Sequence, residues 1–138
     1  MKALVIDGSI AIGFLLKDEQ SAVAMKALDS IEEGVPAYIP AHWAVEVANG
    51  LIMAERRKRA SQADVTEALG LAAALPVLAD EQTAARAGSD IAALARQYRL
   101  TIYDAAYLEL AMRRGAALAT TDHALAKAAK AAGVPLVT

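Results

Sequence analysis

Short apolar runs alternate along the chain with longer segments in which apolar residues recur every three or four positions. The short runs predict strands at 2–6, 37–39, 76–78, 117–120 and 135–137. The helical spacing predicts helices at 8–16, 19–33, 43–59, 61–75, 80–99, 103–114 and 122–132. Ser9 is expected to cap the first of these helices.

Strands that alternate with helices favour a parallel sheet with helices on both of its faces. We therefore expect an α/β fold in which a short parallel sheet is flanked by helices. The 138 residues fit one domain, which we place at 1–138, and 57% of them are hydrophobic, enough for a packed core. We find no internal repeat, linker or low-complexity segment.

Composition narrows the class of protein. There is no cysteine, which excludes a disulfide scaffold and a thiolate metal site. No apolar stretch is long enough to span a bilayer, and the apolar start closed by Asp7 is not a secretory signal, so we expect a cytoplasmic protein without membrane contact. The net charge of −2 is unusual for a nucleic-acid binder, but bound divalent ions would reverse the local sign around a carboxylate cluster.

Two acidic residues follow predicted strands and two lie early in predicted helices. Asp7 directly follows the first strand and Asp122 follows the fourth, while Glu46 and Asp104 lie early in their helices. Because sites in open α/β sheets form at the carboxyl ends of the strands, all four should point to one rim. Their mutual repulsion calls for hard divalent cations, which prefer carboxylate oxygen and activate water for phosphodiester hydrolysis.

Each acid also has an ordinary structural interpretation. Asp7, Asp104 and Asp122 stand at helix starts, where carboxylates cap and complement the helix dipole. Glu46 is harder to explain in this way, because its neighbours at 43–48 are apolar. The joint pattern, more than any single residue, favours a metal site.

Four segments, in this order, resemble the motifs of PIN-domain ribonucleases, and in particular the VapC-type toxins of toxin–antitoxin pairs. They are Val5-Ile6-Asp7-Gly8-Ser9, Glu46-Val47-Ala48-Asn49-Gly50-Leu51, Tyr103-Asp104-Ala105-Ala106-Tyr107 and Leu118-Ala119-Thr120-Thr121-Asp122. The resemblance covers essentially the whole chain, and no core acid is missing.

This resemblance implies a three-layer α/β sandwich and cleavage of RNA that depends on Mg²⁺ or Mn²⁺. The metal-facing, catalytic acids would be Asp7, Glu46, Asp104 and Asp122. Ser9 and Thr120 would orient water or a carboxylate. The resemblance also implies a homodimer that a cognate antitoxin protein inhibits. The identity of the RNA and the number of metal ions stay open.

Other polar and aromatic residues allow two interpretations each. Asn49, one turn after Glu46, is either a hydrogen-bond partner of that carboxylate or an ordinary helix residue. The basic run 56–59 and the pair 113–114 end helices, and we expect at most one of these clusters to touch RNA. Tyr107 either packs in the core or stacks on a base. The two histidines lack the partners of a zinc site.

Two other functions remain possible from the residues alone. One is a different Mg²⁺-dependent phosphohydrolase with Asp7 as nucleophile, although such enzymes usually carry a second acid where this chain has Ser9. The other is a non-catalytic module that binds a partner through the alanine-rich helices at 19–33 and 64–75.

Overall fold

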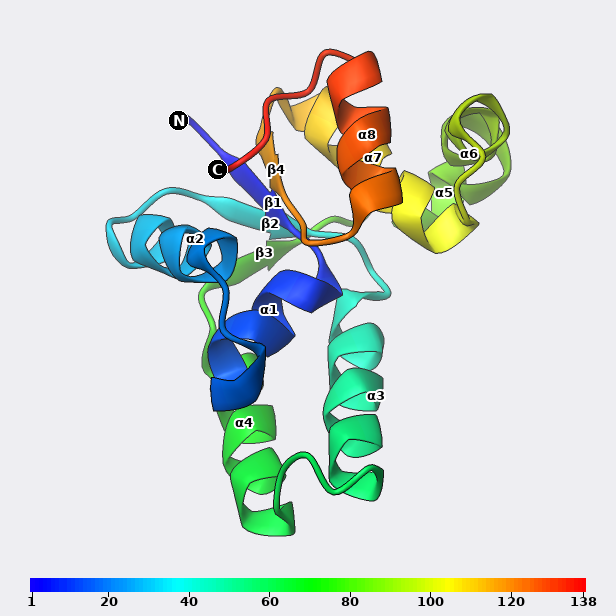
Figure 1. Cartoon of the computed structure of the whole chain (residues 1–138). Helices are drawn as coiled ribbons and strands as arrows, with labels where there is room; N and C mark the ends of the chain where they lie inside the picture. Colours follow the sequence, from blue (N-terminus) through cyan, green and yellow to red (C-terminus); the bar gives the residue numbers. More distant parts are fainter.

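The computed structural model describes all residues from Met1 to Thr138. Its centre is a four-stranded sheet in the order β3-β2-β1-β4, and every neighbouring pair of strands is parallel (Figure 1). The strands are β1 (Leu4–Ile6), β2 (Ala37–Ile39), β3 (Val77–Ala79) and β4 (Ala117–Ala119). Strand β1 is hydrogen-bonded on both sides and fully buried, which explains its unbroken apolar sequence.

The predicted fifth strand at 135–137 does not form. Only Leu136 makes a bridge, to Leu118 in β4. Two hydrogen bonds hold this bridge, from Leu118 N to Pro135 O (2.8 Å) and from Val137 N to Leu118 O (3.0 Å). Pro135 has no N–H to donate to the next carbonyl of β4, so the ladder cannot extend in that direction.

Helices connect and cover the strands. They are α1 (Gly8–Leu15), α2 (Ala22–Glu32), α3 (Trp43–Arg56), α4 (Gln62–Ala74), α5 (Thr83–Arg86), α6 (Ala92–Tyr98), α7 (Ile102–Arg114) and α8 (His123–Ala131). A 3₁₀ turn at Lys17–Glu19 separates α1 from α2, which begins after its N-cap Ser21 instead of at Glu19. The helix predicted at 80–99 begins only at Thr83 and is interrupted by a π-helical turn at Ala87–Ile91.

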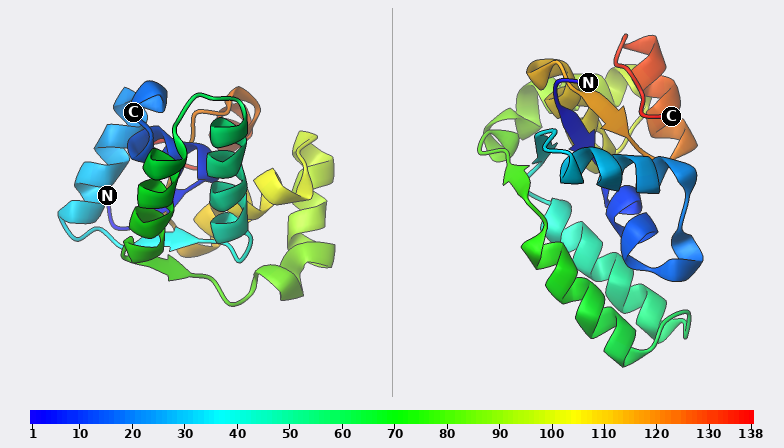
Figure 2. Two further views of the ribbon diagram at one scale, coloured as in Figure 1. Left: turned by 90° about the horizontal axis from the view of Figure 1, so that it is seen from below. Right: turned by 90° about the vertical axis from the view of Figure 1, so that its left-hand side faces the viewer.

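The helices form layers on both sides of the sheet, which confirms the expected α/β sandwich. Helix α7 packs across β1, β2 and β4, with α8 beside it, and α2 lies against β4 from the opposite face (Figures 1 and 2). Helices α3 and α4 pack side by side and project beyond the carboxyl ends of the strands, where α1 joins them. No helix combines the length and apolar character needed to cross a membrane.

Candidate metal centre

Asp7 is the buried centre of the acidic rim. It follows β1 directly, and only 4% of its surface is exposed. Its carboxylate accepts hydrogen bonds from the Ile10 backbone N–H (3.1 Å), from the Ser9 hydroxyl (2.6 Å) and from the Thr120 hydroxyl. The N-cap of α1 is therefore Asp7, and the expectation that Ser9 caps this helix is wrong, because the Ser9 hydroxyl donates to Asp7.

Thr120 and Asp122 approach Asp7 from the loop that follows β4. The Thr120 hydroxyl donates to Asp7 and accepts from the Asp122 backbone N–H (3.0 Å). Asp122 caps α8, and it does so through one oxygen, Oδ1, which accepts from Ala124 N (2.8 Å) and Leu125 N (3.1 Å). The other carboxylate oxygen is not used by the cap, so capping and ligand binding do not compete at Asp122.

Glu46 reaches the rim from the first turn of α3, against the start of α1. A Cβ atom at Gly8 would collide with the Glu46 carboxylate, so the missing side chain at position 8 is what permits this close approach. Asn49, a candidate partner of Glu46, is not part of this contact. It is exposed on α3 and makes no hydrogen bond to Glu46.

Electrostatics show that the four acids converge. Burial raises the pKa of Asp7, Glu46 and Asp104 above their ordinary values. Repulsion from the other acids raises these pKa values further: Asp122 acts on Asp7, Asp7 and Asp104 act on Glu46, and Asp122 and Asp7 act on Asp104. No Lys or Arg side chain forms an ion pair with any of the four acids, so no side-chain cation neutralises the rim directly.

Two further side chains border Glu46 that sequence reasoning did not place at the site. His42 Nε2 lies 3.6 Å from Glu46 Oε2, and burial lowers the pKa of His42, which keeps it neutral at pH 7. Tyr107 is fully buried beside Glu46, and burial with the neighbouring negative charges raises the pKa of its phenol. His42 precedes Glu46 by four residues, a spacing that puts both on one side of a helix and could have indicated it. The complete burial of Tyr107 excludes base stacking and supports its core role.

The chemistry of this donor set fits a hard divalent ion. Carboxylates are the preferred ligands of Mg²⁺ and Mn²⁺, and these carboxylates have no other positive partner. Yet no group of three acidic or histidine side chains is arranged as a ready cage for one ion. Mg²⁺ binding does not require such a cage, because this ion usually takes one or two protein carboxylates and fills its remaining positions with water and substrate phosphate.

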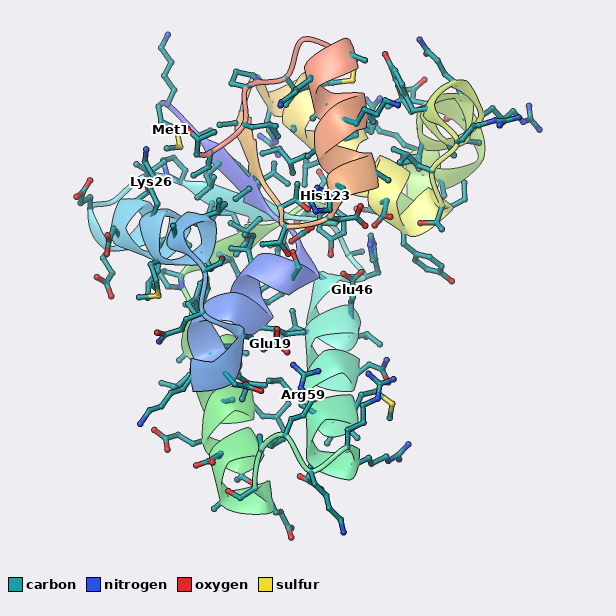
Figure 3. All side chains as sticks on the ribbon, viewed as in Figure 1. Met1, Glu19, Lys26, Glu46, Arg59 and His123 are labelled. Atoms are coloured by element: carbon teal, nitrogen blue, oxygen red, sulfur yellow. The ribbon has the colours of Figure 1, made fainter.

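The two basic clusters differ in availability. Arg113 is engaged in buried ion pairs with Asp80 and Glu109, and Arg114 lies over the Tyr38 ring, 4.4 Å from its centroid. In the run at 56–59, Arg59 pairs with Asp18 and Glu19, and the other three side chains are exposed without an ion-pair partner. Figure 3 shows Arg59 and Glu19 between α1 and α3, below Glu46.

A cavity of about 340 Å³ connects the rim to this basic run. Ser9 and Thr121 line it at the rim, and Arg57 and Arg59 line it farther along α3. Of the two clusters, the run at 56–59 is thus the one with an unpaired cation, Arg57, in a cavity that reaches the rim.

Comparison with known proteins agrees with this fold. The sequence matches the family model of the PIN domain over residues 4–131. The chain therefore belongs to the PIN domain family, whose members are typically nucleases that depend on divalent metal ions.

Two solved structures share the fold. The crystal structure of PAE2754 from Pyrobaculum aerophilum has a TM-score of 0.71 at 22% identity and covers 98% of this chain and 83% of its own. FitAcB from Neisseria gonorrhoeae has a TM-score of 0.55 at 19% identity and covers 98% of this chain and 96% of its own. No curated protein matches the sequence at a significant level.

Proposed function

We propose that this protein is an endoribonuclease that depends on Mg²⁺ or Mn²⁺, with Asp7, Glu46, Asp104 and Asp122 as its metal-binding, catalytic acids. The observation that supports it best is a rim of neighbouring acids in which burial and mutual repulsion raise the pKa values of Asp7, Glu46 and Asp104, and in which no Lys or Arg forms an ion pair with an acid. When bound there, a divalent ion would supply an activated water and stabilise negative charge on the scissile phosphate and the leaving oxygen.

The residues around the acids fix their orientation. Ser9 and Thr120 donate to different oxygens of Asp7, which holds the plane of that carboxylate. Gly8 leaves room for Glu46, and the Asp122 cap leaves one oxygen available. Asn49 is exposed one turn along α3, where it is available to the substrate instead of to Glu46. The free cations at 56–58 would contact phosphates of the RNA beyond the cleaved bond.

We further propose that the nuclease is the toxin of a toxin–antitoxin pair, acting on RNA in the cytoplasm as a homodimer that a cognate antitoxin protein inhibits. The four motif segments, which resemble VapC-type toxins in order and residue type, support this proposal. A small neighbouring reading frame, expressed together with this chain and co-purifying with it, is the expected observation.

Cleavage of RNA tests the catalytic proposal. Purified protein is incubated with a mixed RNA substrate in Mg²⁺, in Mn²⁺ and in EDTA, and cleavage is expected only with the metals. Asp104→Asn and Asp7→Asn should each lower the rate by about 100-fold or more, because each removes a charge from the ion's surroundings. Asp29→Asn, an exposed acid on α2, is the matched control and should keep the full rate.

The outcome separates the other functions. Cleavage that survives EDTA, or persists in Asp7→Asn and Asp104→Asn, contradicts the metal mechanism. A phosphorylated Asp7 would indicate a phosphohydrolase with an aspartyl nucleophile. Absence of cleavage with either metal, together with capture of a protein partner, would indicate a binding module.

A further inference from the structure

We propose that Tyr103 is a stacking platform for one nucleobase of a single-stranded RNA, held in place by His42 at the edge of the acidic rim. The inference rests on the proposed nuclease function and deepens it, because it adds a base-binding subsite next to the acids that would act on the phosphate.

The exposure of Tyr103 is the first observation. In the first turn of α7, Tyr103 comes directly before Asp104 and is 64% exposed, whereas Tyr107, one turn later on the same helix, is fully buried. Packing of the core accounts for Tyr107. It does not account for a large aromatic side chain left open to solvent beside a candidate catalytic acid, because exposure forgoes the free energy of burial.

The support beneath this ring is the second observation. His42 contacts Tyr103 edge to face, with ring centroids 5.5 Å apart and planes at 61°. His42 is in turn fixed by Tyr107, at 5.1 Å and 68°, and lies 3.6 Å from Glu46. The partly buried His42, backed by the fully buried Tyr107, thus supports the Tyr103 ring and leaves most of its side chain accessible to a ligand.

The charges near Tyr103 favour a nucleobase as the ligand. Asp104, the next residue on α7, is an acid with Asp7 and Asp122 near it, so a phosphate placed beside Tyr103 would meet negative charge. RNA that lies along this side of an acidic rim therefore needs a contact that does not depend on charge. Stacking on an aromatic ring provides it, and single-stranded RNA presents unstacked bases for this purpose.

The test compares Tyr103 variants for binding and cleavage of the same RNA. A labelled single-stranded oligonucleotide that the wild-type protein cleaves is prepared intact and with one abasic nucleotide at successive positions around the cleaved bond. Tyr103→Ala should weaken binding of the intact RNA or raise its KM by roughly fivefold or more, the effect of losing one stacked base. Tyr103→Phe should bind as the wild type does. Ile102→Ala, which changes an exposed apolar neighbour, is the matched control.

The abasic series separates stacking from a general disturbance of Asp104. For the wild type, one abasic position should weaken binding by about the same factor as Tyr103→Ala, and that position should have no effect in Tyr103→Ala. An abasic penalty that is unchanged in Tyr103→Ala, or a Tyr103→Ala variant with wild-type KM, overturns the platform while the nuclease function stands. A Tyr103→Ala variant that binds the antitoxin more weakly, but binds and cleaves RNA as the wild type does, also overturns the platform. A wild-type protein that neither cleaves nor binds RNA refutes both proposals.

Discussion

Arg113→Met tests the buried ion pairs that join the end of β3 to α7. Arg113 donates to both oxygens of Asp80, at 3.0 and 2.8 Å, and to Glu109 at 2.8 Å. Asp80 is 4% exposed and Glu109 is 5% exposed, so the substitution leaves the buried Asp80 carboxylate without its cation, and Glu109 keeps only Arg86, at 3.6 Å. Breaking such a pair by removing one partner costs about 3–5 kcal/mol, which for a domain of this size lowers Tm by roughly 10–20 °C.

The pKa of Asp80 determines how the stability from this ion pair changes with pH. Although burial opposes ionisation, Arg113 holds the pKa of Asp80 below its ordinary value in the folded protein. The stability from this pair is therefore present above the pKa of Asp80 in the unfolded chain, near 4, and is lost as the pH falls through the lower folded value. In Arg113→Met, burial without the cation should raise the pKa of Asp80. On acidification, Asp80 of the variant should therefore take up a proton at a higher pH than Asp80 of the wild type, which removes the cost of its buried charge.

Urea unfolding of the two proteins between pH 7 and pH 4 measures this difference. The free energy of unfolding should differ most near neutral pH, and the difference should shrink on acidification. Arg56→Met, an exposed arginine in the last turn of α3, should change stability by less than about 0.5 kcal/mol. A loss below 1 kcal/mol for Arg113→Met at pH 7, or a difference that grows at low pH, would refute the reasoning.

Three other changes have expected outcomes. In EDTA at neutral pH, Asp104→Asn should melt at or above the wild-type Tm, because it relieves repulsion from Asp122 and Asp7. In Mg²⁺ the order of the two Tm values should reverse, because an ion at 100 times its Kd adds about 2.7 kcal/mol to the free energy of unfolding of the wild type and less to that of the variant. An unchanged order in a thermal melt would argue against metal binding here. Gly8→Ala should reduce RNA cleavage with little change in the far-UV spectrum, because the new Cβ displaces the Glu46 carboxylate; full activity would contradict this packing. Gly70→Ala on α4 meets open space and should raise the free energy of unfolding by about 0.5–1 kcal/mol with cleavage unaltered, and a loss of stability would count against the helix assigned there.

Local pattern was sufficient for most of the elements. The apolar run at 37–39 is β2 without any shift, and the predicted strand at 117–120 contains β4. These predictions succeed because a buried strand or a buried helix face requires apolar residues at regular intervals, and these intervals can be recognised in the sequence. The same pattern failed where the backbone departs from a regular period, as at the π-helical turn of Ala87–Ile91 and at Pro135.

The local sequence pattern could not predict contacts between residues far apart in the chain. Arg113 was interpreted as a helix-end cation, but Asp80, 33 positions earlier in the chain, turns it into a buried ion-pair partner. The sequence left Tyr107 as either a core or a base-stacking residue, and only packing decided that it is buried while Tyr103, four residues earlier on α7, is open.

The sequence by itself placed Asp7 after β1 and Asp122 after β4, and these two acids lie near each other because neighbouring parallel strands present the same ends to one edge of the sheet. Only the tertiary structure decided how those acids are held. Thr120 reaches Asp7 across 113 positions, and Tyr107 contacts Glu46 from another helix, α7. The direction of each of these side chains depends on how the helices pack, which no local spacing records.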